Sequence, residues 1–94
     1  MTKTAILRIE CNPPKRFGSG SDFIFGIKDE MLARGEAGET VTMEVPLGVQ
    51  EITVLVRNTG IDSLNGVTRV DVDGDMSFRI RYGLFSKSAK LVLL

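Results

Sequence analysis

The sequence contains no histidine and no tryptophan, and it has only one cysteine and one tyrosine. Histidine is the usual general base beside a serine or cysteine nucleophile, so its absence excludes the common catalytic triads. Cys11 cannot form an internal disulfide and belongs to no CxxC motif, so we expect a structural thiol and a fold stabilised by packing alone. We therefore predict that the protein is not an enzyme and uses no cofactor.

Long apolar segments are also missing. No stretch approaches the ~18 consecutive apolar residues that a membrane span requires. Near the N-terminus, the apolar residues 5–7 are followed at once by Arg8, which is not typical of a signal-peptide core. We expect a soluble, cytoplasmic protein without a membrane span. The alternative is that a leader has been removed from a longer precursor.

The chain has no excess charge of either sign, because its 12 Lys and Arg residues balance its 12 Asp and Glu residues. A nucleic-acid binder normally shows a basic excess or a clustered basic face. In the second half of the sequence the two signs are interleaved, with Arg57, Arg69, Arg79 and Arg81 among Glu51, Asp71 and Asp75. We interpret this pattern as a solvated surface and predict no nucleic-acid partner.

Alternating apolar residues are the strongest pattern that is present. The 94 residues suffice for one domain, spanning 1–94. Residues 40–57 show two alternating segments separated by Pro46 and Gly48, which are typical turn residues. The apolar face of the first segment consists of Val41, Met43 and Val45, and that of the second of Ile52, Val54 and Val56. This pattern predicts a β-hairpin with one buried and one solvated face.

Other segments have the same period of two. Further strands are predicted at 4–10, 22–28, 31–34, 67–72, 76–82 and 89–94, with loops at 15–21 and 58–66. A single helical turn is the alternative for 31–34. Strands 67–72 and 76–82 are expected to pair with Val72 opposite Met76, since a two-residue loop would place Val72 opposite the charged Asp75. The apolar residues of 89–94 indicate a strand that is buried on both faces or that shields an edge.

These strands predict an all-β fold. We expect an antiparallel β-sandwich, immunoglobulin-like or jelly-roll-like, with about 7–8 short strands and no long helix. A small barrel is the alternative architecture.

Two motifs suggest ligand chemistry, but both are incomplete. Residues 71–75 match the D-x-D-x-D start of a calcium loop, but Met76 stands where Gly is required and Tyr82 where a bidentate Glu is required. We interpret them as a turn and predict no metal site. Residues 18–21 are rich in glycine and serine, yet no Gly-Lys-Ser/Thr follows them, so we interpret them as a loop. The aromatic residues that could form a binding surface are Phe17, Tyr82 and Phe85.

Residues 22–57 contain a strand (22–28), an Asp29-Glu30 turn, Gly38-Glu39, a Val45-Pro46-Leu47-Gly48 turn and the alternating residues 52–54. In this order of elements the segment resembles small bacterial β-sandwich modules of the PEGA-like type. It departs from them in lacking the Pro-Glu-Gly-Ala string. The resemblance implies a non-catalytic module that presents an interaction surface, and it assigns no functional residues.

We therefore predict a non-catalytic protein-interaction or accessory domain. Its partner surface would be a sheet edge or the loops at one end, residues 12–21 and 58–66. The alternative is a small-ligand or carbohydrate-binding module that uses Phe17, Tyr82 or Phe85 as a stacking surface. A protein partner or self-association is expected, because the apolar final strand leaves an edge to be covered.

Overall fold

The computed structural model describes residues 3–14, 20–58, 63–83 and 85–94 of the 94-residue chain. These residues form β-strands and no helix, so none of them belongs to a helix that could cross a membrane. The eight strands are β1 (Thr4–Glu10), β2 (Ser21–Ile27), β3 (Glu30–Glu36), β4 (Thr40–Pro46), β5 (Gly48–Asn58), β6 (Ser63–Val72), β7 (Met76–Gly83) and β8 (Ser88–Leu93). The prediction of an all-β chain of about seven or eight strands is confirmed.

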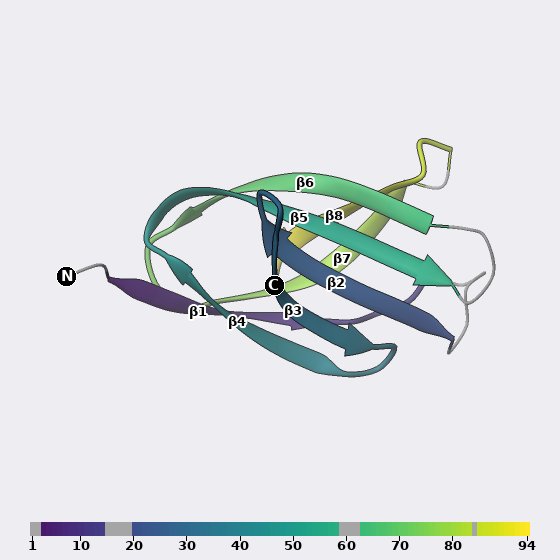
Figure 1. Cartoon of the computed structure of the whole chain (residues 1–94), viewed down its shortest axis with the longest axis horizontal. Helices are drawn as coiled ribbons and strands as arrows, with labels where there is room; N and C mark the ends of the chain where they lie inside the picture. Colours follow the sequence, from purple (N-terminus) through teal and green to yellow (C-terminus); the bar gives the residue numbers. More distant parts are fainter. Residues whose placement is uncertain (1–2, 15–19, 59–62, 84) are drawn as a thin grey trace.

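The strands form one hydrogen-bonded sheet in the order β3-β2-β5-β6-β8-β7-β1-β4. This sheet curls round an elongated core into a nearly closed barrel (Figure 1). We call β3-β2-β5-β6 the first half and β8-β7-β1-β4 the second half. They are continuous at the single bridge between Asn65 and Ser88, so the structure is a barrel-like sheet rather than the two separate sheets of the predicted sandwich. The sheet is also mixed rather than purely antiparallel, since β1 and β7 are parallel neighbours.

The core lies inside this sheet and follows the predicted alternation. Buried residues come from every second position of most strands, as expected when successive side chains point to opposite faces of a sheet. The largest fully buried side chains are Leu7, Ile9, Phe23, Phe25, Val45, Ile52, Val54, Val56 and Val72. The inward faces predicted for the two alternating segments of residues 40–57 are therefore confirmed, and β1, β2 and β7 alternate in the same way.

The predicted hairpin of residues 40–57 is wrong, although both of its strands exist. β4 pairs with β1, whereas β5 pairs with β2 and β6, so the two strands lie in different halves. Gly48 has φ of +107°, a left-handed conformation that glycine adopts without strain, and it redirects the chain from one half to the other. The alternation identifies the inward face of each strand, but it does not show which strands pair. Two strands with inward apolar faces can face each other across the core instead of pairing side by side in the sheet.

The predicted pairing of Val72 with Met76 is also wrong. β6 and β7 are not neighbours, because residues 73–75 carry the chain from the first half to the second. Asp75 contributes to this crossing: its Oδ1 accepts a hydrogen bond of 2.8 Å from the backbone N–H of Ile6. The β1–β7 ladder begins directly beyond it, at Leu7 and Met76.

Several boundaries differ from the prediction. Residues 63–66 were expected in a loop but start β6, and Leu64 is part of the core. Residues 30–36 form a full strand rather than a helical turn. The last strand, β8, lies inside the sheet between β6 and β7 and is buried on one face only, because Lys90 on its other face is exposed, whereas Ala89 and Leu91 are buried.

Candidate functional site

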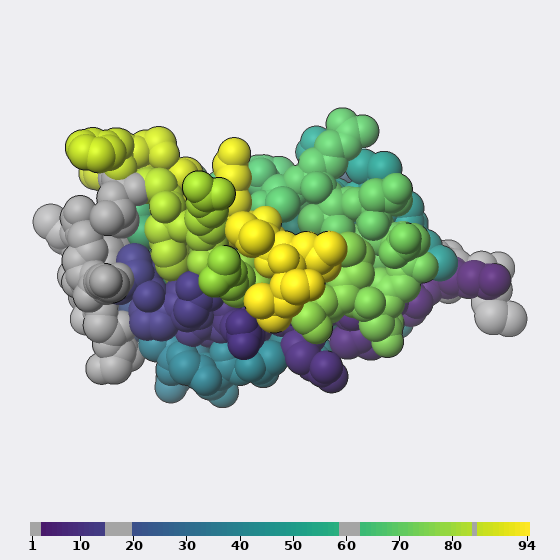
Figure 2. Space-filling view, turned by 180° about the vertical axis from the view of Figure 1, so that it is seen from behind, coloured from purple at the N-terminus to yellow at the C-terminus, as the bar shows by residue number. Residues whose placement is uncertain are grey.

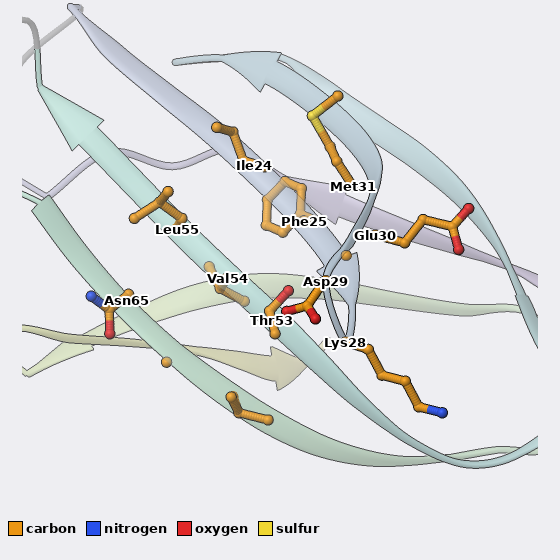
Figure 3. A pocket seen from close by; sticks show the side chains of 13 residues that line it. Ile24, Phe25, Lys28, Asp29, Glu30, Met31, Thr53, Val54, Leu55 and Asn65 are labelled. Carbon is orange, nitrogen blue, oxygen red and sulfur yellow. The ribbon is translucent and has the colours of Figure 1, made fainter.

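The outer face of β2, β5 and β6 has an apolar groove of about 400 Å³ (Figure 3). Ile24 and Leu55 are direct cross-strand partners on its floor, and the register places Thr53 opposite Val67 in the next row. These positions point away from the core, where an antiparallel strand usually has polar residues facing water. Val67 remains 53% exposed, so an apolar surface is open to solvent at this point.

The β2–β3 connection forms one wall of the groove. A register shift between Phe25 and Gly26 produces a bulge. A Cβ atom at Gly26 would collide with the backbone carbonyl oxygen of Glu30, so only glycine permits the two strands to approach this closely. Lys28 then turns the chain with a φ of 56°, and Met31 lies on the wall with 59% of its surface exposed.

Polar side chains surround the apolar floor. Lys28, Asp29 and Glu30 lie at the end near the β2–β3 turn, and Asn65 lies on the opposite side, on β6 (Figure 3). Two adjoining hollows of about 620 and 630 Å³ share Lys28 and Asp29 with the groove. The turn therefore stands between three depressions of the surface, which gives a ligand access from several directions.

The chemistry of this arrangement favours binding. An apolar floor with a few polar groups at its margin is the usual composition of a ligand pocket. Across the part of the chain that the structure describes, no group of three or more His, Cys, Asp or Glu residues could hold a metal ion. The groove thus offers apolar contact to a side chain or ligand, with one cation and two carboxylates placed to orient it.

Tyr82, predicted as part of a stacking surface, has a different environment. It points inward and is half-buried, and its hydroxyl donates a hydrogen bond of 2.6 Å to the backbone carbonyl oxygen of Asn12. Burial raises the pKa of this hydroxyl well above its ordinary value of 10.0. Its position indicates an anchor between β7 and the segment after β1, and it does not line the groove.

The other predicted aromatic residues do not line the groove either. Phe85 is fully exposed in the turn 85–87 between β7 and β8. Phe17 falls outside the described residues, as do residues 15–19 and 59–62 of the predicted partner loops. A stacking role for Phe85 or Phe17 stays a prediction.

The aspartates of residues 71–75 do not converge on a described hollow. Asp71, Asp73 and Asp75 line none of the three depressions described above. Asp75 instead binds the backbone of β1, as described for the chain crossing. The structural role of this carboxylate agrees with the interpretation of these residues as a turn.

The groove residues were missed by the sequence reasoning, although a signal was present. Ile24 is flanked by Phe23 and Phe25, and Leu55 is flanked by Val54 and Val56. Three consecutive apolar residues in a strand place one of them on the outer face, because side chains alternate. The two triplets are cross-strand neighbours, which brings their outward members together.

The chain matches no protein-family description, no curated protein and no solved structure. The functional argument therefore rests on the geometry of the chain itself.

Proposed function

We propose that the protein is a non-catalytic interaction module whose groove on β2, β5 and β6 binds an apolar segment of a partner protein. The observation that supports this most directly is the exposure of Val67 and Met31 beside Ile24 and Leu55. Apolar surface gathered in a hollow and bordered by polar groups is typical of an interaction site, whereas scattered exposed residues are not. The resemblance to PEGA-like modules, which also implies an interaction role, stays a prediction.

The affinity should be modest. Full burial of a Val or Met side chain stabilises by about 1.5–3 kcal/mol, and both are already about half covered, so each adds roughly 1 kcal/mol. The loss of translational and rotational freedom on association offsets much of such a gain. We therefore expect dissociation constants in the micromolar range or weaker for a short segment that occupies the groove alone.

A small apolar ligand is the second candidate for the same groove. Its volume of about 400 Å³ lies within the range usual for small-molecule pockets. The polar groups at the β2–β3 turn would then orient the ligand. This candidate shares the groove with the first and differs only in the occupant, so one set of variants tests both.

The test is a selection of peptides from a displayed random library on the purified protein, followed by affinity measurements on variants. We expect the selected peptides to be rich in aliphatic residues and to bind the Val67→Asp and Leu55→Asp variants at least about tenfold more weakly. The physical reason is that a carboxylate in the groove floor must be desolvated when an apolar side chain covers it.

Leu93→Asp is the matched control, because Leu93 is exposed to a similar extent, 58%, but lies on β8 away from the groove. Amide NMR spectra establish that each variant is folded. Peptides that bind Val67→Asp as tightly as the wild type would refute the groove as the site. If no peptide is selected but a hydrophobic dye binds the wild type and not Val67→Asp, the small-ligand function is favoured.

A further inference from the structure

The fold separates charges that the sequence interleaves. Four exposed cations lie at outward positions of three neighbouring strands of the second half: Arg8 on β1, Arg79 and Arg81 on β7, and Lys90 on β8. Arg81 and Lys90 are direct cross-strand partners. Arg8 is paired with Ser77 of β7. Ser77 and Arg79 are successive outward positions of β7, about 7 Å apart along the strand. We call these four residues the cationic face; Figure 2 shows β7 and β8 exposed on this side of the molecule.

Carboxylates do not neutralise this face in the described parts of the chain. The ion pairs found there join Asp22 to Arg34 at 2.7 Å and to Arg57 at 3.4 Å, and all three residues belong to the first half. On the second half, Asp75 accepts from the N–H of Ile6 and is committed to the backbone. Glu10 is the remaining acidic residue at an outward position of β1, β7 or β8, and Glu44 lies on the neighbouring β4 as the cross-strand partner of Ile6. The four positive charges are therefore bordered by the three negative charges of Asp75, Glu10 and Glu44, and no ion pair joins the two groups within the described residues.

Aliphatic side chains border the cationic face. Val92 is the cross-strand partner of Arg79 and is half-buried. Ile6 and Leu94 are 38% and 62% exposed, and the backbone N–H of Leu94 donates to the carbonyl oxygen of Ser77 beside Arg8. No outward position of β1, β7 or β8 within the described residues is aromatic, so this surface has no platform on which a nucleic-acid base could stack.

We propose that the cationic face of β1, β7 and β8 binds an acidic segment of a partner protein, with aliphatic residues of that segment packing on the border. Guanidinium groups bind carboxylates through paired hydrogen bonds, and three of the four cations are arginines. Charge complementarity of this kind sets the specificity and the rate of association. The face lies on the half of the sheet opposite the groove, so the two sites can be occupied and tested independently.

The test uses a synthetic peptide of about 15 residues made of Asp-Leu-Glu-Ser repeats, long enough when extended to cross three strands. It is titrated into labelled protein at low salt and followed by amide NMR shifts. We expect the shifts to be confined to the strands around Arg8, Arg79, Arg81 and Lys90. A peptide with every leucine replaced by serine should bind more weakly, because the aliphatic border then has no partner.

The decisive variant is the double change Arg79→Glu and Arg81→Glu, for which we expect at least about a tenfold loss of affinity. Arg57→Glu with Arg69→Glu is the matched control, because it changes the net charge equally but on the other half of the sheet, at two residues that do not line the groove. An equal loss in both double variants would show a response to net charge alone and would overturn the proposal. Tighter binding of single-stranded or duplex DNA than of peptide would also overturn it, in favour of a nucleic-acid partner.

Discussion

Asn12 continues the pairing of β1 with β7 through its side chain. Its Nδ2 donates a hydrogen bond of 2.8 Å to the carbonyl oxygen of Ile80, and its Oδ1 accepts one of 2.9 Å from the N–H of Ile80. An amide side chain thereby replaces a backbone peptide group in the ladder. The backbone carbonyl oxygen of Asn12 accepts a hydrogen bond from the hydroxyl of Tyr82, so Asn12 holds β7 through three hydrogen bonds.

We therefore expect Asn12→Ala to lower the free energy of unfolding by about 2 kcal/mol, because a partly buried N–H and carbonyl of Ile80 lose their partners. Urea denaturation followed by fluorescence or circular dichroism measures the change. Asn65→Ala is the control: Asn65 is exposed on the outer face, so the change should be below about 0.5 kcal/mol. Equal losses in both variants would mean that the side-chain pairing contributes nothing specific.

Two ionisable groups, the buried Cys11 and the half-buried Tyr82, make stability fall at high pH. Burial, with a smaller contribution from the negative charge of Glu39, raises the pKa of the Cys11 thiol from its ordinary value of 9.0 to about 11. Burial likewise raises the pKa of Tyr82. Both groups are neutral when protonated, so the folded state retains protons that the unfolded state releases. The stabilisation is complete below pH 9 and is lost as the pH rises through the folded-state pKa values.

From the Cys11 shift alone we expect a loss of about 2 kcal/mol by pH 11, since one pKa unit corresponds to about 1.4 kcal/mol. Urea denaturation between about pH 8 and pH 11 measures this slope. In the Cys11→Ala variant, the decline should begin only where the tyrosine starts to titrate. Parallel curves for wild type and variant would exclude the thiol as the cause.

Residue burial was largely predictable, whereas these polar roles were not. The inward positions of Phe23, Phe25 and Val54 follow from alternation within one strand, which is local information. The bonds of Asn12 to Ile80 and of Asp75 to Ile6 join residues 68 and 69 positions apart in the sequence. No pattern within a segment specifies such partners, because they depend on which strands the fold makes neighbours.

At the scale of strands, the inward face of a strand could be predicted from the sequence, whereas its neighbouring strands could not. A period of two decides which side chains point inward, and each predicted strand occurs in the structure with boundaries shifted by a few residues. The partner of each strand is decided by the path of the chain. The segments 46–48 and 73–75 have the composition of hairpin turns, yet both carry the chain between the halves of the sheet.

The groove is another consequence of pairing. Ile24 and Leu55 each occupy an outward position between two inward apolar residues of their strand. A single aliphatic residue on an outer face is common and has no special meaning by itself. The antiparallel register of β2 and β5 sets them directly opposite each other. The bulge at Gly26 then allows the β2–β3 turn to form the wall. The two apolar triplets were visible in the sequence, but the site that they form depends on the register between their strands.

At the scale of the whole molecule, a net charge of zero conceals two different surfaces. Arg79 and Arg81 follow Asp71 closely in the sequence, yet β6 and β7 belong to different halves, so these charges face different directions. The parallel pairing of β1 with β7 then adds Arg8 to the same face. Interleaved charge along a chain therefore does not establish mixed charge on its surface.

The barrel is joined weakly where its two halves meet. Between β6 and β8 the ladder consists of the single bridge from Asn65 to Ser88, supplemented by a hydrogen bond of 2.9 Å from the N–H of Leu91 to Oγ1 of Thr68. Gly66 lies at this junction, and a Cβ atom there would collide with the backbone carbonyl oxygen of Ala89. The absence of a side chain lets β8 lie directly against β6.

Gly66→Ala should therefore push the two halves apart and lower the free energy of unfolding by about 2–3 kcal/mol, because backbone atoms cannot move aside as a flexible side chain can. Hydrogen exchange should show faster exchange at the amides of β8 than at those of β2 and β5, whose ladders stay intact. Gly74→Ala is the matched control, since a Cβ atom at Gly74 has no other atom within 4 Å, and it should change stability by less than about 0.5 kcal/mol. If exchange rose equally in all strands, or if both alanine variants were equally stable, the junction between β6 and β8 would not limit the cohesion of the barrel.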